Sequence, residues 1–400
     1  MVAATFTFAA CPAIRFGPGS ARELAEQITP FGRSILLVTG ARSLNATGAL
    51  DGLRDGLAGA AIDTRQVTIG GEPSPEWVDE TVAAMRGSPV DAVVAVGGGS
   101  VIDAGKAISA MLLEEGSVVD FLEGVGTGRV HSGRKVPMLA VPTTAGTGSE
   151  ATKNAVLSRV GAGGFKKSLR HERFVPDVAL VDPELMLTCP PGVTAACGLD
   201  AFTQLLEAYL STKASPLTDA LAWSGLKAVA PNLIPACTDG ADAIEIRTAM
   251  AYGALVSGIV LANAGLGLVH GLASPCGAAV PIPHGVVCGT FLAAVTEITI
   301  EKLHRRHGPH HPALCKYARL GIMMERGGAS GRVPAGEVTT GCRMLVDRLW
   351  QWTEFLNLPR LSHFGLGAGD LEAIAAAASN KNNPIPLGPE AIQEVLRTRL

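Results

Sequence analysis

Two histidines in an apolar, small-residue segment are the side chains best placed for chemistry. His270 and His284 lie fourteen residues apart, with Ser274 and Pro283 between them and no charged residue nearby. An unpaired imidazole is costly to bury, so each ring needs a hydrogen-bond partner or a metal ion. A single histidine of this kind is most simply a hydrogen-bonded core residue. The pair, with a carboxylate upstream, favours a metal site.

An upstream stretch of helical character supplies the carboxylate. Asp200 and Gln204 are four residues apart and therefore share one face of a helix. Glu207 lies near the same face, where both a contribution to the site and a surface ion pair fit its position. Asp200, His270 and His284 together offer one oxygen and two nitrogens. This set suits Zn²⁺ or Fe²⁺ and leaves positions open for a substrate.

Two polar loops follow buried strands in the first half of the chain. An apolar run over 91–96 ends in Gly97, Gly98, Gly99 and Ser100, where bare amides and a helix N-terminus would face a phosphate. A plain tight turn fits this loop equally well. The second loop follows the apolar run 137–141 and carries the hydroxyls of Thr143, Thr144 and Thr147. Two such loops after two buried strands favour a nucleotide site.

The pattern of apolar residues divides the chain near residue 190. Strands are expected before this point at 6–8, 14–16, 34–39, 67–69, 91–96, 137–141, 151–159, 167–170 and 178–181, with helices capped by Ser20 and Ser74. Amphipathic helical runs follow it at 193–211, 216–230, 240–262, 285–297, 337–356 and 369–379. The tract 302–312 is expected to be an exposed loop. The sequence thus predicts an α/β domain with a mainly parallel nucleotide-binding sheet over 1–190 and an all-α domain over 191–400.

Composition excludes several classes of protein. The chain has 400 residues, 47% of them hydrophobic, and a net charge of −3 without a basic block, which argues against nucleic-acid or membrane-surface partners. Residues 1–10 lack the features of a secretory signal and no apolar run is typical of a membrane span, so a cytoplasmic protein is expected. Eight cysteines without a CxxC pair predict buried free thiols rather than disulfides or a cysteine zinc cage.

The motifs taken together resemble the iron-containing alcohol dehydrogenase family. They comprise 97–103, 142–150, 198–201 and 270–285, and they occur in the family's order over nearly the whole chain. The resemblance implies a dehydroquinate-synthase-like fold with a nicotinamide cofactor in the cleft between two domains. It also implies a divalent metal held mainly by the helical domain and a homo-oligomer, commonly a dimer.

Two positions depart from the family's pattern. Asp200, His270 and His284 match three metal ligands, but the usual fourth, a histidine four residues after the aspartate, is Gln204, a weaker donor. Many members carry a second histidine near the reacting alcohol where this chain has Ser274. Proton transfer then passes through Ser274, the ribose hydroxyls or water. Similar glycerol dehydrogenases use one Asp and two His, whereas similar maleylacetate reductases need no metal.

The resemblance also assigns cofactor contacts. Gly97, Gly98, Gly99 and Ser100 are expected at the pyrophosphate, and Lys166 matches a lysine that reaches the ribose region. Asp103, Thr143, Thr144 and Thr147 are expected to belong to the same cofactor site. The first strand ends in Gly40, followed by Arg42, where NAD users often have an aspartate. This change permits NADP as well as NAD, although Arg42 also fits a solvated loop residue.

The predicted reaction is reversible hydride transfer between the nicotinamide and a small alcohol or its aldehyde or ketone. The metal would polarise the carbonyl. One alternative is a metal-independent carbonyl reductase resembling maleylacetate reductase. Another is a catalytically retired nucleotide-binding protein, against which the joint presence of Asp200, His270 and His284 argues.

Overall fold

The first half of the chain builds a parallel sheet. A computed structural model describes residues 5–41, 48–161, 164–327, 331 and 333–400. The strands are β1 (Ala13–Phe16), β2 (Ser34–Gly40), β3 (Asp63–Ile69), β4 (Ala92–Gly97), β5 (Met138–Pro142) and β8 (Val178–Val181). They lie in the order β1-β8-β5-β4-β2-β3, and every neighbouring pair is parallel. All residues of β4 and β5 are buried, as expected for central strands covered on both faces.

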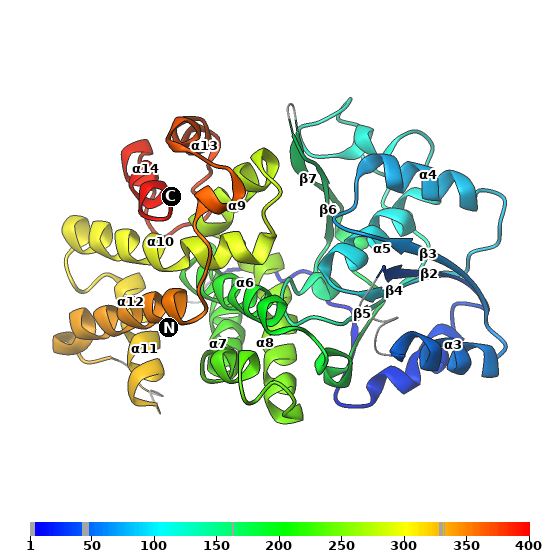
Figure 1. The fold of residues 1–400 in the computed structure, drawn as a ribbon, viewed down its shortest axis with the longest axis horizontal. Coiled ribbons are helices and arrows are strands. Elements are labelled where there is room, and N and C mark those ends of the chain that lie inside the picture. The colour runs from blue at the N-terminus through cyan, green and yellow to red at the C-terminus, as the bar shows by residue number, and fades with distance from the viewer. Residues whose placement is uncertain (1–4, 42–47, 162–163, 328–330, 332) are drawn as a thin grey trace.

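Helices cover both faces of this sheet. They are α1 (Leu24–Ile28), α3 (Ala49–Gly59), α4 (Pro75–Met85) and α5 (Gly99–Met111). One apolar cluster joins the sheet to α4 and α5 through Val78 and Ile102, and another joins it to α1 and α3 through Leu24 and Leu57. Figure 1 shows this α/β half on the right of the molecule. The predicted α/β class is confirmed.

The two predicted helix caps have different outcomes. Ser74 caps α4 as expected, because its hydroxyl accepts a hydrogen bond of 3.2 Å from the backbone N–H of Trp77. Ser20 does not cap a helix. It is the first residue of a short 3₁₀ turn (Ser20–Glu23) before α1, and its hydroxyl donates to the carbonyl of Val181 at 3.3 Å.

Two predicted strands form a separate hairpin. β6 (Asn154–Arg159) and β7 (Phe165–Arg170) pair antiparallel with each other and not with the main sheet. The hairpin packs against α5 and also meets the helical half at α9. It therefore forms a side wall at the junction of the two halves.

The second half is helical, as predicted. Its helices are α6 (Pro191–Leu210), α7 (Pro216–Cys237), α8 (Ile244–Ala264), α9 (Leu268–Ala279), α10 (His284–His307), α11 (Pro312–Arg326), α12 (Val338–Phe355), α13 (Leu371–Ala377) and α14 (Pro389–Thr398). One large apolar core runs through them and includes Phe202, Leu226 and Phe291. The helices lie side by side on the left of Figure 1.

One of these helices is apolar enough to cross a membrane. α8 reaches a mean hydropathy of 1.4 over an 18-residue window, and 61% of that window is buried inside the protein. It packs against α6 and α7. Its apolar character is therefore that of a core helix.

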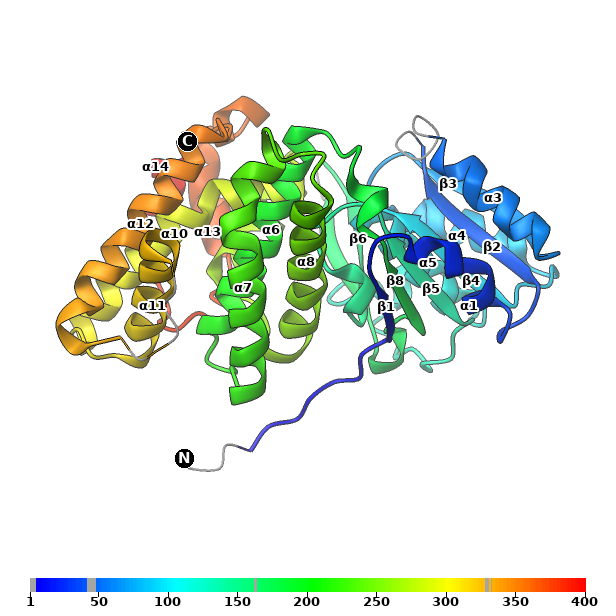
Figure 2. The ribbon, with the colours of Figure 1, turned by 90° about the horizontal axis from the view of Figure 1, so that it is seen from below.

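The expected strand at 6–8 is wrong. Residues 5–12 run without regular structure from β1 towards the helical half, as Figure 2 shows. Phe8 packs into a cluster with Leu255 of α8, and the backbone N–H of Ala9 donates to the side-chain oxygen of Asn263 at 2.6 Å. Phe8 is thus partly buried by contact with a helix, whereas Phe6 is exposed.

The expected loop at 302–312 is also wrong. α10 continues to His307, and α11 begins at Pro312, so the connector is only 308–311. His304, Arg305, Arg306 and His307 occupy the last turn of α10. Cations at this end of a helix interact favourably with its dipole, which explains how a polar tract continues the helix.

A pair of glycines brings the two halves into close contact. Gly148, in the loop after β5, has a φ of 60°, a conformation that other residues rarely adopt. A Cβ atom on Gly258 of α8 would lie 2.1 Å from the carbonyl oxygen of Gly148. Backbone therefore packs directly on backbone beside the cleft.

Candidate metal centre and nucleotide cleft

A cleft of about 690 Å³ lies where the α/β half meets the helical half. Both halves contribute to its lining. Nine of the site residues expected from the sequence line it, namely Gly99, Ser100, Asp103, Thr147, Lys166, Gln204, His270, Ser274 and His284.

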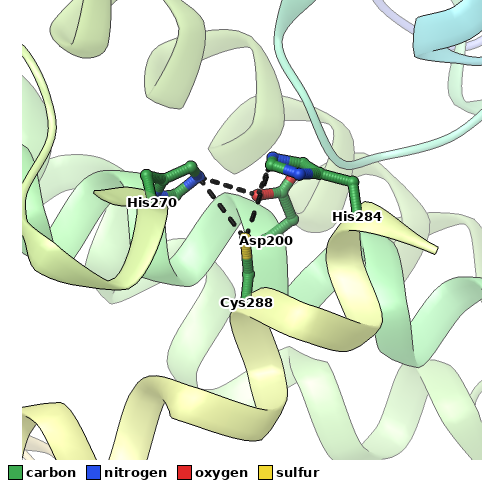
Figure 3. Close-up of side chains that lie close together, drawn as sticks. All are labelled: Asp200, His270, His284 and Cys288. Carbon is green, nitrogen blue, oxygen red and sulfur yellow. Dashed lines mark hydrogen bonds and ion pairs between the residues drawn. The ribbon is translucent and has the colours of Figure 1, made fainter. Parts of the chain in front are cut away.

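Four side chains converge at the helical wall of this cleft. Asp200 lies on α6, His270 on α9, and His284 and Cys288 on α10. Their potential ligand atoms all lie within 4.8 Å of one another. Nε2 of His270 is 3.2 Å and Nε2 of His284 is 3.8 Å from Oδ1 of Asp200. Figure 3 shows all four side chains pointing at one another.

Close helix packing explains why this segment is rich in small residues. A Cβ atom on Gly285 would lie 2.3 Å from the carbonyl oxygen of Ala196 on α6. One on Gly271 would lie 1.7 Å from the carbonyl oxygen of Ser379. Only glycine permits these approaches, which bring α10 against α6 and its carboxylate, and α9 against the segment that follows α13.

A buried carboxylate orients His270 from behind. Oε2 of Glu207 lies 2.7 Å from Nδ1 of His270, and Oε1 accepts the backbone N–H of Val269 at 2.7 Å. Nδ1–H of His270 is therefore held by Glu207, which leaves Nε2 directed at Asp200. A carboxylate behind a histidine is the usual outer support of a metal ligand. The sequence allowed Glu207 either a role in the site or a surface ion pair. The structure favours the role in the site.

Burial and mutual charge shift the pKa values of all four clustered groups. Burial would raise the pKa of Asp200, but the two histidines hold it below its usual range. Burial would lower the pKa of His270, yet the Cys288 and Glu207 charges raise it well above the ordinary value. Burial lowers the pKa of His284 to about 4 and raises that of Cys288 to about 11. Binding of a divalent ion here would displace the thiol proton of Cys288 and the proton on Nε2 of His270.

The residues that depart from the family pattern have different surroundings. The side-chain oxygen of Gln204 accepts a hydrogen bond of 2.7 Å from Ser257 of α8, and Ser257 also contacts the carbonyl of Gly146 at 3.4 Å. Ser274 lies one turn after His270 on α9 and is exposed in the cleft. The side chain of Gln204 is thus held by a hydrogen bond, whereas that of Ser274 is exposed where a substrate could contact it.

The two predicted nucleotide loops lie against each other. The N–H of Thr143 donates to the carbonyl of Gly97 at 3.0 Å. A Cβ atom on Gly98 would lie 3.3 Å from the hydroxyl of Thr144, and one on Gly99 would lie 2.7 Å from that of Thr147. The glycines are therefore needed for the approach of the threonine loop, and α5 begins with its N-terminus at this junction.

Asp103 takes part in a buried network behind these loops. Its carboxylate accepts hydrogen bonds from the hydroxyl of Ser149 and from the N–H of Val156, the latter at 3.0 Å. Lys106, whose side chain is fully buried, donates to Ser149 at 2.9 Å, to Thr152 at 2.8 Å and to a backbone carbonyl of β6. The network ties α5 to the loop and hairpin that border the cleft.

Two further residues expected at the cofactor are described by the structure. Lys166 on β7 lines the cleft and forms an ion pair with Glu72. Gly40 ends β2, and a Cβ atom on it would lie 3.6 Å from the side chain of Val101. Arg42 lies outside the described residues.

The sequence reasoning missed Cys288. The eight cysteines are free thiols, three of them buried and Cys11 exposed, so the expectation of buried thiols holds for only some of them. Cys288 stands four residues after His284 and therefore on the same helix face. That spacing was the available signal, whereas the search for CxxC pairs overlooked it.

This combination of fold and site defines a class of two-part proteins, in which a parallel sheet with a glycine-rich loop faces a helical half that carries a candidate metal centre. The comparison with known families is specific. The family described as iron-containing alcohol dehydrogenase matches residues 11–183, and its C-terminal part matches residues 194–400. The chain belongs to the iron-containing alcohol dehydrogenase family, and its activity is that of an oxidoreductase.

Similar proteins cover most of the chain. Long-chain-alcohol dehydrogenase 1 of Geobacillus thermodenitrificans is 31% identical over 94% of this chain and 92% of its own length. The NAD-dependent methanol dehydrogenase of Bacillus methanolicus is 35% identical over 72% of this chain and 76% of its own. A crystal structure of 1,3-propanediol oxidoreductase aligns with a TM-score of 0.86 and 27% identity, over 99% of this chain and 100% of the other.

Proposed function

We propose that this dehydrogenase interconverts a small alcohol and its aldehyde or ketone with a nicotinamide cofactor, and that its metal is held by Asp200, His270, His284 and Cys288. The observation that carries the proposal is the convergence of four ligand atoms within 4.8 Å at the wall of the cleft. One carboxylate, two imidazoles and one thiolate are donors that suit Zn²⁺ or Fe²⁺, and a fifth position on the ion would be left for the substrate oxygen. When bound, the ion supplies Lewis-acid polarisation of the substrate oxygen.

The protein's own groups have separate tasks. Asp200 and His284 hold the ion from α6 and α10, while Glu207 keeps the proton of His270 on Nδ1. Ser274, exposed in the cleft one turn beyond His270, is the side chain we assign to proton transfer at the substrate oxygen, with the ribose hydroxyls or water as relays. The surrounding helices exclude water from His270, which is 3% exposed.

Cys288 supplies the donor that Gln204 does not. Sγ of Cys288 lies 3.6 Å from Nε2 of His270 and 3.8 Å from Nε2 of His284. The amide oxygen of Gln204 is occupied by Ser257. A thiolate is also a stronger donor to Zn²⁺ than a neutral amide, so the replacement strengthens the site.

The cofactor is proposed to lie with its pyrophosphate at Gly97, Gly98, Gly99 and Ser100. Thr143, Thr144 and Thr147 border the same loop, and Lys166 reaches towards the ribose from β7. Asp103 then supports the loop from behind through Ser149. NAD and NADP are both compatible with Gly40 at the end of β2, since no carboxylate there would repel a 2′-phosphate.

A domain division near residue 190 is also part of the proposal. The last strand ends at Val181 and α6 begins at Pro191, so domains of 1–190 and 191–400 are proposed. We also propose that the protein is a cytoplasmic homodimer.

Metal analysis of the purified protein tests the proposal. We expect about one Fe²⁺ or Zn²⁺ per chain. Removal of the metal by a chelator should abolish the oxidation of NADH and NADPH by small aldehydes, and added metal should restore it. Full turnover by metal-free protein would instead establish the metal-independent reductase. Tight nucleotide binding without turnover would establish the retired binder.

Ligand identity is tested with cobalt in place of the native metal. Co²⁺ bound to a thiolate gives a sulfur-to-metal charge-transfer band. We expect Cys288→Ala to remove this band and weaken metal binding, whereas Gln204→Leu and the remote control Cys342→Ala keep the band. Absence of the band in the unchanged protein, together with a loss of metal in Gln204→Leu but not in Cys288→Ala, would assign the fourth position to Gln204.

A further inference from the structure

The cations that line the cleft fall into two groups. Lys153, Lys166 and Arg170 come from the β6–β7 side, and each forms an ion pair with a carboxylate. Their partners are Glu172, Glu72 and Glu123, the last at 2.7 Å from Arg170. These three charges are therefore already balanced within the α/β half.

The second group belongs to the helical half. Lys213 follows α6 and Lys381 follows α13, and both line the cleft with His270 and Ser274. Among the described residues, neither lysine forms an ion pair. The carboxylates of the lining are Glu72 and Asp103. Both belong to the opposite wall and have partners there, so neither lysine is paired with a carboxylate of the lining.

The two lysines stand on segments that are fastened together. The N–H of Thr212 donates to the carbonyl of Asn382 at 3.0 Å, and the N–H of Asn382 donates to the carbonyl of Leu266 at 3.0 Å. Leu266 lies just before α9, which carries His270. These hydrogen bonds therefore hold the segments that carry Lys213 and Lys381 beside the start of α9.

Lys381 lines the cleft together with His270 and Ser274, and its side chain is exposed there. Partial burial lowers the pKa of its ammonium group, and the nearby Glu207 and Cys288 oppose that shift. Its backbone has a φ of 46°, which costs about 1 kcal/mol for a residue with a side chain.

We propose that the substrate carries an oxyanion, a carboxylate or a sulfonate, that Lys381 and Lys213 bind while its carbonyl faces His270 and Ser274. This inference rests on the proposed function and specifies its substrate. The cofactor pyrophosphate does not account for the lysines, because it is assigned to the glycine loop on the opposite wall. In reduction, the carbonyl carbon gains the hydride of NADH or NADPH and its oxygen gains a proton, which yields the hydroxy acid and the oxidised cofactor.

Matched substrate pairs test the proposal with the metal-loaded enzyme. Butanal is compared with 4-oxobutanoate, and propanal with 2-oxoethanesulfonate, so that each pair differs chiefly in the charged end. We expect kcat/KM to be at least about tenfold higher for one anionic member, because a charged group in the cleft gains charge-assisted hydrogen bonds. The pair with the larger ratio distinguishes a carboxylate from a sulfonate.

Variants assign the preference to the lysines. Lys381→Met should lower the anionic-to-neutral ratio about tenfold through a higher KM, and Lys381→Arg should restore part of it. Lys213→Met should lower the ratio in the same direction. Lys227→Met, on the exposed side of α7 away from the cleft, should leave the ratio unchanged.

The outcomes separate the two proposals. Equal turnover of neutral and anionic aldehydes would overturn the oxyanion site and leave the dehydrogenase activity in place. If no aldehyde is reduced, calorimetry of the enzyme–NAD complex with 4-hydroxybutanoate, 2-hydroxyethanesulfonate and 1-butanol decides. Preferential binding of either anion would then support the oxyanion site even though the proposed reaction had failed. Equal binding of all three compounds, or no binding, would overturn the oxyanion site.

Discussion

Glu207 is the residue on which the geometry of the metal centre most depends without being a ligand. Replacement by glutamine keeps the size of the side chain and its bond to Val269 but removes the charge that faces Nδ1 of His270. We expect Glu207→Gln to weaken metal binding about 10- to 100-fold, as for other outer-shell carboxylates.

The Kd for Zn²⁺, measured against a competing chelator, checks this expectation. Glu301→Gln, an exposed carboxylate near the far end of α10, is the matched control and should leave the Kd unchanged. Equal Kd values for Glu207→Gln and the unchanged protein would show that Glu207 serves only to cap α9.

Three of the four residues of the metal centre could be predicted from the sequence. Asp200, His270 and His284 are polar groups in apolar runs, so their types and spacing predict the cluster that the structure brings together. The bond between Gln204 and Ser257 joins positions 53 residues apart on different helices. No local pattern encodes such a contact, and the same is true of Cys288 beside His270.

At the scale of elements, Glu150 makes the junction of α5 and the threonine loop sensitive to pH. Burial raises the pKa of this carboxyl to about 7, while Lys106 opposes the shift. The folded protein then binds more protons than the unfolded chain between about pH 4.5 and 7. The free energy of unfolding should therefore fall as the pH rises through this range, by up to about 3 kcal/mol from this group.

Urea unfolding at pH 5 and pH 7.5 measures the effect. Glu150→Gln cannot titrate, so its free energy of unfolding should change less between the two pH values than that of the unchanged protein. Glu372→Gln, exposed on α13, should retain the full difference. The same pH dependence in Glu150→Gln would exclude this carboxyl as its source.

Elements with strong local signals were predicted well, and those set by packing were not. The buried valine and alanine runs of β4 and β5 and the cap of α4 agree with the structure. α9 was missed because Gly271 and Pro275 are poor helix formers. Its helix is selected by the tight approach to Ser379 and by Glu207 at its first turn, which are tertiary contacts.

At the scale of the whole molecule, the order of strands followed by helices predicts the two halves but not how they meet. The cleft exists because the loop after β5 rests on α8, where Gly148 and Gly258 bring two backbones together. Asp200, His270 and His284 on one side thereby face Lys166 and the glycine loop on the other. Such a placement depends on surfaces far apart in the sequence, which periodicity does not describe.

This junction leads to a prediction for the enzyme as a whole. In Gly258→Ala the new methyl group would lie 2.1 Å from the carbonyl oxygen of Gly148, so the two halves must move apart. Overpacking of this kind costs about 1–3 kcal/mol. A displacement of the cofactor by about 1 Å relative to the metal lowers kcat about 100-fold.

Gly56→Ala is the control, since a Cβ on this exposed glycine of α3 meets nothing within 4 Å. Urea unfolding and aldehyde turnover of both variants decide: normal stability and kcat in Gly258→Ala would mean that the halves are not held in register at this contact.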